Sequence, residues 1–306
     1  MADPTHGPGI DYAAPLTINE ALLMKTILIP IDFSALAQST AHFGLELAQR
    51  MTARIVLLHV VQPSPPVPTF NVPVVELTAW NDTLQAQMAQ ALSHFQGEIG
   101  HYQRERGLTS VPISTRLVVG QPADCILDVA ASEKASFIVM GTVGAANAWD
   151  KLIGSVASAV AQRADRPVWI LPAAVPLDSL RRFAYFADME GQELSCINQV
   201  MNLGERLRAK LEVVHVSPLL DEEFDVAESL VESFEDTYAP ERITFHHLTF
   251  DSVPEGIETY VRSHQPDVIV LAHRNRGFVE KIFHKSLIRQ LSLTTKRPLL
   301  IIPKKS

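Results

Sequence analysis

An internal repeat constrains this chain more than any other feature of its sequence. A shift of 131 residues aligns residues 119–172 with a later stretch without a gap, so that Ser155 superimposes on Ser286 and Pro172 on Pro303. The aligned pairs also include Arg166–Pro167 with Arg297–Pro298. The residues themselves therefore predict a duplicated domain.

The repeat continues toward the N-terminus with a different shift. Asp32 precedes His59 by 27 residues, and Asp188 precedes His215 by the same 27, which sets the earlier shift at 156. The second copy is therefore 25 residues shorter between its second and third apolar runs. The first copy fills that length with a proline-rich stretch and a long helical pattern.

Short apolar runs alternate with helical patterns in both copies. In the first copy the runs are 26–31, 55–60, 113–118, 137–140 and 168–171, with helices expected at 37–51, 75–106, 123–133 and 155–163. In the second copy the runs are 183–187, 211–216, 243–248, 268–272 and 299–302. Strands buried on both faces read as continuous apolar runs, and alternation with helices is typical of βαβ crossovers. We therefore expect α/β domains, each a parallel sheet with helices on both faces.

The repeat also divides the chain. We expect a loose N-terminal extension over 1–23, a first domain over 24–173, a linker over 174–180 and a second domain over 181–306. Met24 is an alternative start. The extension lacks a basic region followed by a clear apolar one, so we do not expect a secretory signal.

Composition narrows the functional classes. The 306 residues carry a net charge of −8, which argues against broad electrostatic binding to nucleic acid. No apolar run approaches the roughly 20 residues that span a bilayer. The two cysteines, Cys125 and Cys196, show no metal-type or redox-type spacing. We expect a cytoplasmic protein with reduced thiols that contacts neither membrane nor nucleic acid.

Glycines follow the fourth apolar run of the first copy. Gly141 and Gly144 come directly after the run, and a Gly154–Ser155 pair opens the next helix. Glycine allows positive φ and close approach of the backbone, and the free N–H groups of a helix N-terminus attract anions. The pattern therefore suits a polyphosphate. The alternative is that the glycines only form turns and Ser155 only caps the helix.

The chain resembles the universal stress protein family. Its glycines and Ser155 fit the family's ATP motif G-x2-G-x9-G-[S/T], and MKTILIPIDFS, IVLLHVV, VGQPADCILDVA and DRPVWILP resemble the family's other segments, in the family's order. The similarity covers residues 24–172, with a weaker copy over 181–304. The resemblance implies two tandem Rossmann-like universal stress protein domains, each a five-stranded parallel sheet in the order 3-2-1-4-5.

The resemblance also implies the ligand and the residues that hold it. ATP, with or without Mg²⁺, would bind in the first domain. The adenosine side would be formed by Ile31, Asp32 and Val60, the phosphates would lie on Gly141, Gly144, Gly154 and Ser155, and Met140 and Val156 would line the pocket. Asp32 could instead cap the following helix jointly with Ser34. For His59, which also fits the family pattern, a structural role is favoured.

Two departures from the family pattern are expected to weaken the binding of phosphate. Ala157 stands where relatives often carry a second hydroxyl, and the nine-residue spacer holds Lys151 as its only cation. The second domain departs further, because Ala272, Asn275 and Lys285 replace the three glycines. Its Asp188 and Val216 remain, so its pocket is expected to keep its shape without a phosphate cradle.

Other side chains allow further interpretations. The basic residues between 274 and 289 form either a solvated helix face or an anion or partner site. His246 and His247 are adjacent on one strand and so point to opposite faces, which disfavours a shared metal. Cys125 is expected in the core. The apolar stripe of the 75–106 helix is typical of core packing, part of it against the second domain.

Three classes of function remain open. The first is a nucleotide-dependent regulator of the stress response, with one ATP per chain and the two domains packed as an internal pseudo-dimer. The second is a slow ATPase or phosphotransferase, for which the carboxylates near the loop are Asp32 and Asp150. The third is an interaction module without a working site. Association into homo-oligomers is compatible with each.

Overall fold

The computed structural model describes residues 24–62, 74–142, 154–172, 174–188, 193–218, 241–273 and 297–304. Several predicted features lie outside these residues: the N-terminal extension, Gly144, Asp150, Lys151 and the basic segment of the second copy.

The first half of the chain forms five strands and four helices in the described residues. The strands are β1 (Lys25–Pro30), β2 (Ala53–Val61), β3 (Ile113–Val119), β4 (Ala135–Gly141) and β5 (Val168–Leu171). The helices are α2 (Ala35–Met51), α3 (Val74–Glu105), α4 (Pro122–Ser132) and α5 (Ser155–Arg163). Each bound lies within two residues of the one expected from the apolar pattern.

The second half repeats this arrangement after a short 3₁₀ turn, η1 (Leu177–Ser179). Its strands are β6 (Arg182–Ala187), β7 (Lys210–Pro218), β8 (Ile243–Phe250), β9 (Val268–His273) and β10 (Leu299–Pro303). Its helices in the described residues are α6 (Glu193–Leu207) and α8 (Val253–His264).

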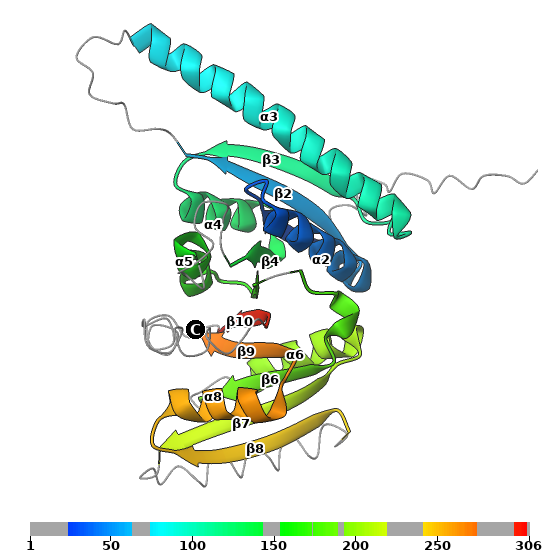
Figure 1. The fold of residues 1–306 in the computed structure, drawn as a ribbon, viewed down its shortest axis with the longest axis vertical. Helices are drawn as coiled ribbons and strands as arrows, with labels where there is room; N and C mark the ends of the chain where they lie inside the picture. Colours follow the sequence, from blue (N-terminus) through cyan, green and yellow to red (C-terminus); the bar gives the residue numbers. More distant parts are fainter. Residues whose placement is uncertain are drawn as a thin grey trace, which may run out of the picture.

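The described strands join into a single ten-stranded sheet with the order β3-β2-β1-β4-β5-β10-β9-β6-β7-β8. Each half contributes five parallel strands in the expected order 3-2-1-4-5, which confirms the predicted fold. The halves meet where β5 and β10 pair antiparallel, Leu299 opposite Ile170 (Figure 1). The sequence did not predict this β5–β10 pairing, here called the seam, which joins two five-stranded sheets into one.

Helices cover both faces of the sheet, as the buried strands require. The cluster on one face combines side chains of α2, α3 and α6, and that on the other combines side chains of α4, α5 and α8. Trp169 of β5 is fully buried beside the seam, with its ring 5.4 Å from that of Phe43 and 6.0 Å from that of Phe183. The core therefore continues across the junction between the halves.

Candidate functional site

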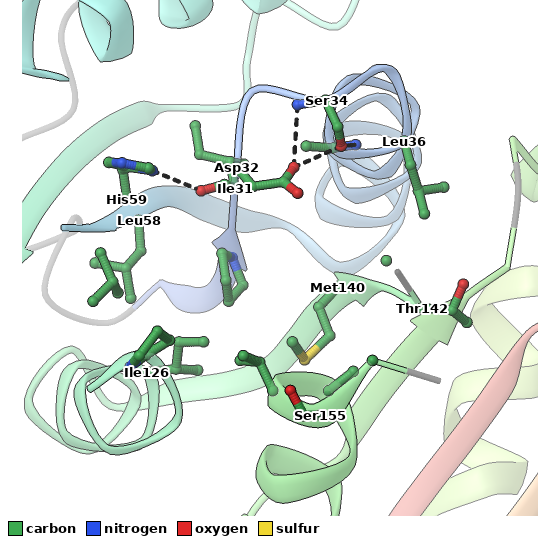
Figure 2. A pocket seen from close by; sticks show the side chains of 18 of the residues that line it. Ile31, Asp32, Ser34, Leu36, Leu58, His59, Ile126, Met140, Thr142 and Ser155 are labelled. Carbon is green, nitrogen blue, oxygen red and sulfur yellow. Dashed lines mark hydrogen bonds between the residues drawn. The ribbon is translucent and has the colours of Figure 1, made fainter. Parts of the chain in front are cut away.

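The predicted site residues meet at the carboxyl ends of β1, β2 and β4. A cavity of about 360 Å³ opens there (Figure 2). All eight described members of the predicted set line it: Ile31, Asp32, Val60, Met140, Gly141, Gly154, Ser155 and Val156. Open parallel sheets bind ligands at this edge, outside the carboxyl ends of their strands.

The turn after β1 forms one wall of the cavity. The Asp32 carboxylate accepts hydrogen bonds from the Ser34 backbone N–H at 3.1 Å and from the Ser34 hydroxyl at 2.6 Å. The Ser34 oxygen in turn accepts from the Ala37 N–H and caps α2. Asp32 is therefore not the cap itself: it orients the capping serine, and its side chain stays at the exposed mouth of the cavity.

His59 is tied to the same turn. Its Nδ1 lies 2.9 Å from the Ile31 carbonyl oxygen, so a proton on Nδ1 donates to that acceptor. The imidazole ring lies 4.4 Å from the ring of Phe33, whose φ is 61°, a left-handed conformation. His59 holds the turn after β1 in place and also lines the cavity.

The start of α5 forms the opposite wall. Its N-cap is Gly154, so no side chain caps the first turn, and the Gly154 N–H donates to the Thr142 carbonyl. The free N–H groups of this turn carry the positive end of the helix dipole. Figure 2 shows Ser155 on this side of the cavity, across from Asp32 and Ser34.

One of the two expected reasons for the glycines, a positive φ, was wrong for both described members of the motif, Gly141 and Gly154. The positive-φ glycines of the described residues are Gly107 and Gly120, and Gly154 has φ −61° and ψ 155°. A Cβ on Gly141 would lie 2.8 Å from both Cγ and Cδ2 of Leu36. A side chain at position 141 would therefore have to displace Leu36, so the packing of β4 against α2 favours glycine here whether or not a ligand binds.

Several lining residues were not predicted as site residues. Leu36, Leu58, Pro122 and Ile126 add apolar surface, and Thr142 follows β4. Pro122 and Ile126 belong to a segment that already resembled the family, so the signal was present and not used. No sequence pattern marks Leu36 as a site residue, because its position in the cavity depends on how α2 crosses β4.

The same position in the second half has different surroundings. His215 repeats the contact of His59, with its Nδ1 3.1 Å from the Ala187 carbonyl oxygen. Asp188, however, forms an ion pair with Lys304, whose side chain is only 2% exposed. Lys304 also donates to Glu193 at 3.2 Å, and Glu193 accepts from the Asp188 N–H at 2.9 Å.

This network is strongly buried. Burial chiefly, with a hydrogen bond shared with Asp188, raises the pKa of Glu193 to about 7. Burial also raises the pKa of Tyr185, which donates its hydroxyl proton to Glu193. A single buried cation, Lys304, thus pairs with Asp188 and also contacts Glu193, where the first half has an open cavity.

The adjacent histidines of β8 lie on opposite faces, as expected. The His246 ring lies 5.3 Å from that of Tyr260 in α8, while His247 stacks on His215 and its Nε2 is 2.8 Å from the Ser217 hydroxyl. Within the described ranges the structure shows no cluster of three or more residues suited to a metal ion.

Comparisons with known proteins identify the class. The model of the universal stress protein family matches residues 24–172. A universal stress protein of Methanocaldococcus jannaschii is 32% identical over 149 residues, covering 49% of this chain and 82% of its own length. A relative named as a universal stress protein in Thermus aquaticus is 30% identical over 150 residues, 49% of this chain and 99% of its own length.

The chain belongs to the universal stress protein family. Its whole fold is matched by the crystal structure of a universal stress protein from Archaeoglobus fulgidus, with 17% identity, a TM-score of 0.67, and coverage of 92% of this chain and 97% of that one. The two curated relatives, in contrast, each match about half of this chain. This difference in coverage fits a tandem arrangement of two similar halves. No helix among the described residues is long and apolar enough to cross a membrane.

Proposed function

We propose that the first half binds ATP and that the protein acts as a nucleotide-dependent regulator of the stress response in the cytoplasm, with one nucleotide site per chain. The observation that carries the proposal is the uncapped start of α5, which opens into a cavity lined by the motif residues. A volume of about 360 Å³ falls within the usual range of small-molecule sites, roughly 300–1,000 Å³.

The phosphate end of the ligand would lie at this helix start. The N–H groups of Ser155 and Val156 and the Ser155 hydroxyl are donors for anionic oxygens, and the helix dipole adds a favourable field. Because Gly154 has no side chain, phosphate can approach the first turn directly. We assign the same role to Gly144, which lies outside the described residues.

The nucleoside end would lie against β1 and β2. Ile31, Val60 and Met140 supply apolar surface there, and Asp32 supplies a carboxylate at the mouth that can accept hydrogen bonds from ribose hydroxyls. Asp32 is also the one carboxylate among the described lining residues that a phosphate-bound Mg²⁺ could use.

The second half is proposed to bind no ATP. Its equivalent aspartate is neutralised by Lys304, and Ala272 carries a side chain where the first half has Gly141. The two halves would act as a built-in pair, joined through β5 and β10. Nucleotide in the first half could then shift the conformation of a surface that partners read, if ATP prefers one conformation of its loop.

The test replaces Gly154 with two residues of nearly equal shape. Gly154→Asp and Gly154→Asn both suit the extended N-cap conformation and both cap α5, so neither is expected to lower stability. The aspartate places a negative charge against the phosphates and should weaken ATP binding about 100-fold or more. The asparagine, which is neutral, should weaken it far less.

Calorimetric titration of each purified protein with ATP measures this difference. Equal ATP affinity of the Asp and Asn variants would overturn the assignment of the phosphates to α5. An unmodified chain that releases no nucleotide on denaturation and binds no added ATP would overturn the proposed function itself.

A further inference from the structure

A second cavity, of about 760 Å³, opens between the two halves. The first half contributes Lys25 at the start of β1 and residues 135–137 and 165–167. The second half contributes the side of α6 that includes Gln199, Asn202 and Arg206, and the end of β10. We call this space the inter-half cleft.

The repeat gives the cleft a counterpart on the other side of the seam. Every buried residue of α6 matches a buried residue of α2 at a shift of 156. Arg166 donates to the Ala135 carbonyl at 2.9 Å, and Arg297, 131 residues later, donates to the carbonyl of Pro266. The halves are thus related by an approximate two-fold axis through the β5–β10 seam, and the counterpart of the cleft lies between α2 and the start of β6.

That counterpart is filled by the segment that precedes β6. Leu177 and Leu180 are 2% and 1% exposed and join the apolar cluster. The Leu177 N–H donates to the Glu46 carboxylate at 3.3 Å, and Asp178 forms an ion pair with Arg50. Two apolar side chains and one carboxylate therefore fix this segment on α2.

The matching residues of α6 line the open cleft. At the shift of 156, Asn202 stands where α2 has Glu46, and Arg206 stands where it has Arg50. Within the described residues neither side chain forms a hydrogen bond or an ion pair. The inter-half cleft thus presents an amide and a guanidinium group in the places that hold the linker on the other side.

We propose that the N-terminal segment, residues 1–23, docks in the inter-half cleft as the linker docks in its counterpart. It precedes β1 as the linker precedes β6, and residues 21–24 superimpose on residues 177–180 at the shift of 156. At this shift Ala21, Leu22 and Met24 stand where the linker has Leu177, Asp178 and Leu180. Leu22 and Leu23 supply apolar side chains beside the matching positions, and Glu20, two residues before Leu22, supplies a carboxylate for Arg206. Because Lys25 itself lines the cleft, the segment is tethered at the site and its effective concentration there is high.

Hydrogen exchange tests the docking without reference to nucleotide. The full chain is compared with a chain that begins at Met24. Amides of residues 199–206 should exchange about tenfold more slowly in the full chain, because the docked segment suppresses local opening of α6. Amides of residues 43–50 on α2, which the linker already covers, should exchange equally in both. Equal exchange of α6 in the two proteins would overturn the proposal.

Cross-linking with a short bis-maleimide identifies the occupant. Leu22→Cys combined with Asn202→Cys should give an intrachain link several times faster than Leu22→Cys combined with Ser195→Cys, an exposed position of α6 outside the cleft. The native thiols react slowly, because burial raises the pKa of Cys196 to about 11 and also raises the pKa of Cys125. Equal rates for the two pairs, or links mainly between two chains, would contradict docking within one chain.

Discussion

The two halves place an aspartate at the same point of the same fold and give it opposite surroundings. Asp32 lies at the exposed mouth of a cavity and accepts hydrogen bonds from Ser34. Asp188 has a side chain only 13% exposed and is paired with Lys304. The histidine that fixes each turn is retained, since His59 and His215 make the same contact with the backbone.

The two halves thus treat a carboxylate at the end of a parallel sheet differently. The second half pairs it with an ammonium group supplied by the residue after β10. The Asp32 carboxylate of the first half lies at the exposed mouth of the cavity, where Ser34 donates to it. The ammonium group of Lys304 is almost fully buried in the second half, whereas the corresponding place in the first half is an open cavity. The second half thus has an internal ion pair where the first half has a cavity.

The strongest way to break this comparison is Lys304→Met, which keeps the length of the side chain and removes its charge. Asp188 and Glu193 would then be buried without a cation, and such a loss typically costs about 3–5 kcal/mol. Urea unfolding at pH 7.5 should show it. Asp32→Asn in the first half, where the carboxylate is exposed, should change stability by less than about 0.5 kcal/mol. A loss under about 1 kcal/mol in Lys304→Met would mean that the network is not a stabilising element.

The pH dependence of stability sharpens the same contrast. The pKa of Glu193 is raised from 4.5 to about 7 in the folded protein, so the folded state holds this proton more tightly than the unfolded state. The resulting stabilisation is fully present below about pH 4.5 and decreases as the pH rises through about 7. Glu193→Gln should flatten this part of the stability curve, measured by urea unfolding at half-unit pH intervals. An unchanged slope in the Gln variant would assign the dependence to other groups.

Much of the fold could be predicted from the sequence because buried parallel strands are continuous apolar runs. The apolar runs ILIPI, IVLLHV and FIVMG placed the strand bounds to within two residues, and the repeat predicted the same arrangement a second time. The β5–β10 seam could not be predicted, because nothing in VWIL or LLII distinguishes an edge strand that pairs with the other half. That pairing depends on which apolar edges remain uncovered once both halves have folded.

The candidate site could be predicted in part, for a similar reason. Asp32, Gly154 and Ser155 carry local signals, since they follow a strand or open a helix. Lys304 carried no such signal. In the sequence it follows the last apolar run beside a second lysine, as solvated residues do, and only the pairing of β10 with β9 brings it to Asp188. Packing that depends on residues far apart in the sequence leaves no local pattern.

Gly141→Ala tests whether the first glycine of the motif serves packing. The added methyl group would lie 2.8 Å from Leu36, so we expect a loss of about 1–3 kcal/mol in the free energy of unfolding. In a protein that already carries Leu36→Ala, the clash is absent. Gly141→Ala should therefore cost less there than it costs in the unmodified protein. Urea unfolding of the four proteins gives the coupling. If Gly141→Ala leaves stability unchanged, the glycine is retained for a reason other than its contact with α2.

The smallest expected effect compares the serines that begin a helix in each half. Ser34 is the N-cap of α2 and accepts from the Ala37 N–H at 3.1 Å, whereas Ser252, the N-cap of α8, makes no side-chain capping bond. Ser34→Ala should therefore cost about 1 kcal/mol and Ser252→Ala only a few tenths. Because Asp32 orients Ser34, the first substitution should also alter ATP affinity, while the second should not. Equal stability losses at the two positions would mean that the Ser34–Asp32 pair adds nothing to the start of α2.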